Sequence, residues 1–127
     1  MQALAHEPIS RKAGMTAFKR LAERWNLPRK TWPAILKRAP NTINNWISDA
    51  ATDRESKLDA DVQERIAYLV SIYDGLHRLF GDQHHADEWL WQKNRAFGGQ
   101  EPGTRILSGA FADLYELHTY VNRALYG

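Results

Sequence analysis

Amide and hydroxyl side chains gather in one short segment of this sequence, residues 41–45. The four residues concerned are Asn41, Thr42, Asn44 and Asn45. An asparagine amide can pair with both N6 and N7 of adenine, and a threonine hydroxyl can bind a base or a phosphate. The flanking basic residues, which could neutralise phosphates, are Arg29, Lys30, Lys37 and Arg38. The pattern favours a helix that contacts DNA; the alternative is a small bundle whose asparagines only cap and turn.

A second group of notable residues lies in the loop 94–103, which holds three glycines and one proline. Gly98 and Gly99 can adopt positive φ and allow a close approach of the backbone. Phe97, just before them, needs a pocket, either in the chain's own core or in a partner. Aromatic residues and arginine dominate the energetics of protein interfaces. Trp91, Phe97 and Tyr115 are therefore candidate interface anchors, with packing in the chain's own core as the alternative.

Patterns typical of enzymes and metal sites are weak or absent. The segment with metal-ligand residue types contains His84, His85, Asp87 and Glu88. A solvated helix N-terminus, where acidic residues favour the helix dipole, explains it better than a metal. The chain has no cysteine, which excludes disulfides and thiol nucleophiles. It also lacks phosphate-loop and dinucleotide motifs. We therefore predict no catalytic residues, no metal and no cofactor.

Charge is distributed unevenly along the 127 residues. Residues 1–56 hold ten Lys/Arg and five Asp/Glu, a balance of +5, and residues 57–127 hold seven and ten, a balance of −3. A basic half joined to an acidic half suggests two partners of different charge, with nucleic acid as the candidate for the first. The sequence has no stretch near the roughly 18 apolar residues that span a bilayer, and its first residues lack the apolar core of a signal peptide. We therefore expect a cytoplasmic protein with no membrane partner.

Helical periodicity runs through most of the chain. Apolar residues recur every three or four positions, which predicts helices near residues 16–25, 41–48, 58–80, 85–92 and 110–125, and a helical turn at 105–107. A further short helix is predicted to end near Leu36, with Pro33 near its start. No segment shows the alternation of a strand. The fold class is therefore all-α: a flexible tail (1–14), a helix-turn-helix-like domain (15–56, with a polar linker from 49) and a small helical domain (57–127).

Two segments resemble parts of one antitoxin family. Residues 27–46 resemble bacterial helix-turn-helix domains of the Xre or MerR type, with Thr42 and Trp46 at the recurring Thr and Trp of the recognition helix. Lys37 stands where such domains usually have a glycine with positive φ, and Arg38 where they have a buried aliphatic residue. The second half resembles the C-terminal toxin-binding domain of Xre/ParS/MbcA antitoxins through Asn94-Arg95-Ala96-Phe97-Gly98-Gly99-Gln100-Glu101-Pro102, Leu107-Ser108-Gly109 and a closing helix.

The resemblance implies an antitoxin of a type II toxin–antitoxin pair. Its partner would be a RES-domain toxin, which consumes NAD or uses it to ADP-ribosylate a target. The antitoxin would block the toxin's active site and repress its own operon by binding operator DNA, as a homodimer or a toxin–antitoxin hetero-oligomer. The alternative is a transcription regulator whose second half dimerises or senses a ligand. The expected toxin-binding residues are Trp91, Asn94, Arg95, Phe97, Gly98, Gly99, Glu101, Pro102 and Tyr115.

Overall fold

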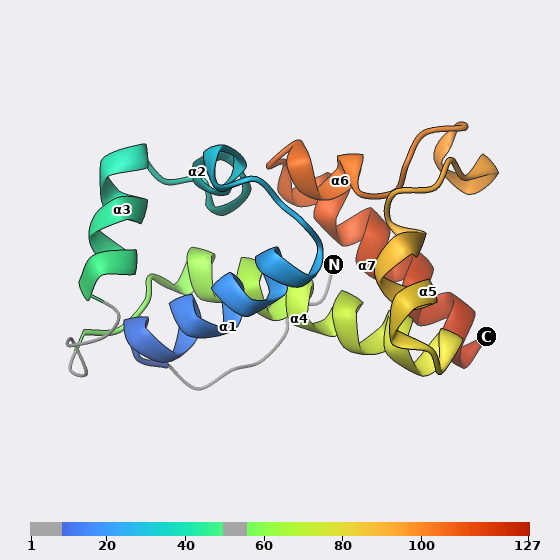
Figure 1. The fold of residues 1–127 in the computed structure, drawn as a ribbon, viewed down its shortest axis with the longest axis horizontal. Helices are drawn as coiled ribbons and strands as arrows, with labels where there is room; N and C mark the ends of the chain where they lie inside the picture. The colour runs from blue at the N-terminus through green and yellow to red at the C-terminus, as the bar shows by residue number, and fades with distance from the viewer. Residues whose placement is uncertain (1–8, 50–55) are drawn as a thin grey trace.

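The computed structural model describes residues 9–49 and 56–127, and the secondary structure elements in these ranges are all helical (Figure 1). In chain order they are α1 (Arg11–Arg24), the 3₁₀ turn η1 (Arg29–Thr31), α2 (Trp32–Leu36), α3 (Pro40–Asp49), α4 (Ala60–Phe80), α5 (Gln83–Trp89), the 3₁₀ turn η2 (Arg95–Phe97), α6 (Thr104–Leu107) and α7 (Phe111–Tyr126). The predicted all-α class, with a helix-turn-helix half followed by a helical half, is confirmed.

The longest helix, α4, contacts helices from both halves of the chain. Its N-terminal part lies beside α1, and its C-terminal part lies against α5 and α7 (Figure 1). Buried apolar residues from both halves form one cluster, whose largest members include Trp25, Phe18 and Tyr68. The division at residues 56 and 57 stays a prediction, and the linker expected at 49–56 lies mostly outside the described residues.

The start of α1 differs from the prediction. The helix begins at Arg11 and not at Thr16, because the Ser10 hydroxyl caps it by accepting a hydrogen bond from the Ala13 backbone N–H at 3.0 Å. Gly14 is buried in this first turn, against the side chain of Leu58. Residues 9–14 are therefore not a loose tail. The sequence did not predict this turn, because Gly14 and Met15 alone do not form a periodic apolar pattern.

The two halves meet at a buried arginine of α4. Arg65 is only 6% exposed. Its Nη1 donates to the carbonyl oxygens of Ile35 at 3.3 Å and Gly109 at 2.9 Å, and its Nε donates to Asp61 at 3.3 Å. Gly109 has φ +74°, and a Cβ there would overlap the backbone carbonyl of Ala34. The end of α2 and the corner before α7 therefore touch backbone to backbone.

Candidate functional site

The loop that follows α5 is closed by its own backbone. The Asn94 N–H donates to the Gln100 carbonyl and the Gly99 N–H to the Asn94 carbonyl, each at 3.0 Å. The Asn94 side chain also caps η2 by accepting from the Ala96 N–H at 2.9 Å. Gly98 and Gly99 have φ +65° and +81°, with open space where a Cβ would stand. Glycine is needed here for the backbone angle, and the loop presents a fixed, exposed turn.

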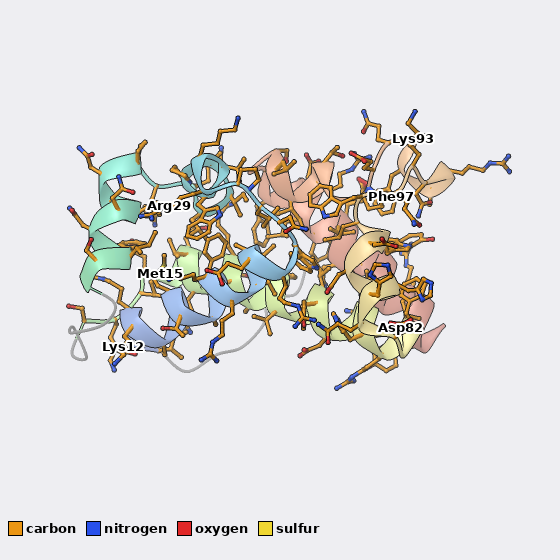
Figure 2. All side chains as sticks on the ribbon, viewed as in Figure 1. Lys12, Met15, Arg29, Asp82, Lys93 and Phe97 are labelled. Carbon is orange, nitrogen blue, oxygen red and sulfur yellow. The ribbon has the colours of Figure 1, made fainter. Side chains whose placement is uncertain are left out.

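Phe97 is the buried end of this loop, and the structure decides between its two alternatives. The side chain is 2% exposed, so it packs in the chain's own core. Its ring lies edge-on to Tyr120 at 5.1 Å and to Trp89 at 6.0 Å between ring centroids. In Figure 2 the labelled Phe97 lies beneath the loop, while Lys93 points outward. Phe97 therefore supports the loop from below and offers a partner no contact in this conformation.

An aromatic surface adjoins the loop, and one of its two rings, Tyr120, was not singled out from the sequence. The rings of Trp89 and Tyr120 stack at 5.9 Å with an angle of 21°, and Tyr120 is 38% exposed. We call these two residues the Trp89–Tyr120 patch. Tyr120 lies on the polar side of α7, where a lone aromatic residue among polar ones is a weak signal in sequence. Together with the loop, the patch gives this end of the molecule a rigid surface with apolar rings.

Arg105 was also missed, and it ties the loop to α7. Its Nε donates to Glu116 at 3.0 Å, and its Nη1 donates to the Gln100 side chain at 2.8 Å. The guanidinium lies 5.3 Å from the centre of the Phe97 ring. Gln100 belongs to the loop and Glu116 to α7, so this one side chain joins the two segments in the folded chain. Arg105 therefore positions the loop.

The other predicted toxin-binding residues divide by exposure. Arg95 is exposed like Gly98 and Gly99, whereas Pro102 is buried like Phe97. The half-buried residues are Trp91, Asn94, Glu101 and Tyr115. The Trp91 indole N–H donates to the Trp25 carbonyl at 3.0 Å, so this ring holds α5 to the end of α1. Within the predicted set, the exposed turn is what a partner can reach directly.

The helix-turn-helix in the first half follows the predicted layout. Ile43 anchors α3 at 1% exposure, and Trp46 and Ile47 are half-buried beside it. The side chains that α3 turns away from the core are Asn41, Asn44 and Asn45, which are exposed, and Thr42, which is half-buried. Arg29 reaches this helix from η1, with Nη2 3.3 Å from the Asn44 side-chain oxygen. Arg29 and Asn44 therefore share one surface, as a DNA-contacting face requires.

Arg38 does not have the free position that phosphate binding needs. Its Nη2 lies 3.1 Å from Asp59, and its Nη1 lies 3.6 Å from Asp61. Its two carboxylate partners follow more than twenty positions later in the chain. The sequence around Arg38 therefore gave no sign that its guanidinium is already paired. Lys30 and Lys37 are exposed.

Lys37 adopts the backbone conformation that glycine usually provides. It ends α2 with φ 56° and ψ 46°, which costs a residue with a Cβ about 1–2 kcal/mol. Lys37→Gly should therefore raise the free energy of unfolding by about 0.5–1 kcal/mol, after allowing for the greater freedom of glycine in the unfolded chain. Urea denaturation followed by tryptophan fluorescence measures it. Asn26→Gly is the control, since Asn26 shares the φ of 56° but asparagine tolerates it; a destabilised Lys37→Gly would contradict the expectation.

His84 and His85 of α5 each pair with an acidic residue close by in sequence. Asp82 caps the helix by accepting from the His84 N–H at 2.9 Å, and it also binds the His85 ring at 2.9 Å. The hydrogen bond from the His84 backbone lowers the pKa of Asp82, and the His85 side chain adds to this effect. His84 lies 3.1 Å from Glu88. Residues 9–49 and 56–127 contain no group of three such side chains arranged to hold a metal.

The fold defines an all-α protein in which a helix-turn-helix shares a core with a second helical region that carries the loop and the Trp89–Tyr120 patch. Residues 4–71 match the family model of the antitoxin Xre-like helix-turn-helix domain, and residues 76–127 match that of the antitoxin Xre/MbcA/ParS C-terminal toxin-binding domain. The chain belongs to this family of antitoxins. It therefore has an antitoxin role, and a toxin protein is the partner of its C-terminal region.

A curated relative covers most of the same length. The uncharacterized protein y4oB of Sinorhizobium fredii (strain NBRC 101917 / NGR234) is 30% identical over 111 residues, which span 87% of this chain and 82% of that protein. The similarity therefore extends over both halves. None of the helices within the described ranges has the length and apolar character needed to cross a membrane.

Proposed function

We propose that the chain neutralises a RES-domain toxin by covering its active-site cleft with the surface formed by the loop and the Trp89–Tyr120 patch. This proposal depends on the exposed turn that contains Arg95, Gly98 and Gly99. Backbone hydrogen bonds fix the shape of the turn, and it lies within the region that matches the toxin-binding domain. A pre-ordered loop loses little conformational entropy when it binds a partner.

Charge supports the same arrangement. The second half of the chain has a balance of −3, from seven basic and ten acidic residues. A cleft that holds the pyrophosphate of NAD is basic, so an acidic domain complements it and is steered toward it. Exposed Arg95 then pairs with an acidic group at the rim, and the two aromatic rings supply apolar contact area.

Toxin affinity of point variants tests this surface. Tyr120→Ala should weaken binding to a RES-domain toxin by about 2 kcal/mol, roughly 30-fold, because a partly exposed aromatic anchor loses its contacts. The control is Tyr126→Ala, the same change at a tyrosine that is 73% exposed on the last turn of α7. The measurement is calorimetric titration of folded variants. Equal affinities for the two variants and for Arg95→Ala would contradict the proposed surface.

The first half is proposed to bind operator DNA and repress the chain's own operon. Asn41, Asn44 and Asn45 would face base edges in the major groove. Thr42 and the exposed cations Arg29, Lys30 and Lys37 would contact phosphates. A homodimer would present two such helices to two half-sites, in the cytoplasm where the DNA lies. Retarded migration of the DNA upstream of the reading frame, but not of a scrambled duplex, would support operator recognition; equal retardation of both would contradict it.

A further inference from the structure

The exposed side of α1 is strongly basic. The helix holds five cationic residues, Arg11, Lys12, Lys19, Arg20 and Arg24, and one acidic residue, Glu23. Arg24 is paired with Asp87 of α5 at 3.3 Å. Lys19 and Arg20 are exposed, and neither has a carboxylate within 4.0 Å among residues 9–49 and 56–127. The middle of α1 therefore presents charge that the described part of the chain does not neutralise.

This basic side lines a hollow that α3 completes. The hollow has a volume of about 380 Å³ and is lined by Met15 and Ile47 with Thr16, and by the charged residues Lys12, Lys19, Arg20 and Glu23. Ile47 comes from α3, the helix that also carries Asn44. In Figure 2, Met15 and Lys12 lie at the end of the molecule that carries α3, far from Lys93.

The hollow therefore lies between α1 and the helix whose Asn44 side chain pairs with Arg29. We propose that the basic side of α1 binds the phosphate backbone of double-stranded DNA next to the segment read by α3. This inference rests on the operator binding proposed above, and it assigns α1 residues that the helix-turn-helix pattern did not include. Such contacts add affinity and fix the register on the duplex, but they carry no base preference.

The ion pairs of Arg38 strengthen the proposal that α1 contacts DNA. Because Asp59 and Asp61 occupy its guanidinium, the cations available around α3 are Arg29, Lys30 and Lys37. Lys19 and Arg20 add two exposed cations from a second helix to this set. An acidic protein segment is the competing occupant, and it is distinguished by the experiment below.

The test measures DNA binding of the full chain at several salt concentrations. The variant is Lys19→Gln with Arg20→Gln, and the probes are the duplex upstream of the reading frame and a scrambled duplex. A plot of log affinity against log salt concentration has a negative slope, whose magnitude falls by about 0.9 for each lost phosphate contact. The double variant should therefore reduce this magnitude by about 1.8 for each bound chain. At about 0.1 M salt this corresponds to binding about 60-fold weaker, for both duplexes alike. A matched control, Lys93→Gln with Arg123→Gln, removes the same charge at the opposite end and should leave slope and affinity unchanged.

The possible outcomes separate the inference from the function on which it rests. If wild type shows no salt-dependent DNA binding, the proposed operator function fails, and this inference fails with it. If wild type binds but the α1 variant matches the control, operator binding survives and the α1 contact is wrong. If the α1 variant loses toxin affinity but keeps DNA affinity, the hollow docks a protein and the inference is overturned. Thermal melts of all variants show that each is folded, as expected for exposed positions.

Discussion

Phe97→Ala is expected to lower the free energy of unfolding by about 3–5 kcal/mol, the usual cost of removing a buried phenylalanine ring. The ring is 2% exposed and contacts both Trp89 and Tyr120. Its loss leaves a cavity beneath the loop and removes the ring on which the Arg105 guanidinium lies. Since small domains are stable by only about 5–15 kcal/mol, a large part of the total is lost. Urea denaturation followed by tryptophan fluorescence measures the change.

The control for this variant is Phe80→Ala. Phe80 ends α4 and is 42% exposed, so the same substitution should cost no more than about 1.5 kcal/mol. Toxin affinity is measured on the fraction that remains folded. If Phe97→Ala kept its stability to within about 0.5 kcal/mol, the size of a neutral surface change, and lost toxin affinity, the ring would be an anchor in the partner and not a support of the loop.

Arg65→Met is the second variant with a large expected effect, a loss of about 3 kcal/mol in the free energy of unfolding. Nη1 of Arg65 is the donor to the carbonyls of both Ile35 and Gly109. A methionine fills much of the volume but donates no hydrogen bond, so two buried acceptors lose this donor at about 1–3 kcal/mol each. Because the lost bonds join α2 to the corner before α7, the contact between the two halves should weaken first.

Arg78→Met provides the matched control on the same helix. Arg78 is exposed and donates to the Tyr126 hydroxyl at 3.2 Å, so its replacement should change stability by about 0.5 kcal/mol or less. Hydrogen exchange of the α2 amides locates the effect, since weakened contact at Ile35 should raise their exchange rates. Equal stabilities of the two variants would show that Arg65 is not the joint between the halves.

Local patterns were sufficient to predict most helices and the turn of the helix-turn-helix. The sequence places apolar residues at helical spacing in α3, α4 and α7, and the structure buries Ile43, Val62 and Val121 there. The left-handed turn at Lys37 could not be expected from its residue type, because a lysine stands where the resemblance has glycine, yet its φ is 56°. The first turn of α1 was missed because Gly14 is buried by Leu58, a residue more than forty positions away.

The candidate site was harder to predict, since its geometry depends on contacts between distant segments. Gly98 and Gly99 could be recognised as a turn from their residue type alone. Whether Phe97 faced the core or a partner could not be decided, because Tyr120, which closes its pocket, lies on another helix. Likewise, the charge of Arg38 seemed available until α4 brought Asp59 and Asp61 beside it. In each case sequence revealed the residue type, and tertiary packing determined which side chain stayed accessible.

The central claim, neutralisation of a RES-type toxin, is tested most directly by NAD consumption. A RES-domain toxin is incubated with NAD and its target, and NAD loss is followed as increasing amounts of the full chain are added. Covering of the active-site cleft predicts that NAD loss falls to background as the chain approaches stoichiometric amounts, and that Tyr120→Ala shifts the titration to higher concentration. NAD loss that continues unchanged with the folded chain in large excess would contradict the account.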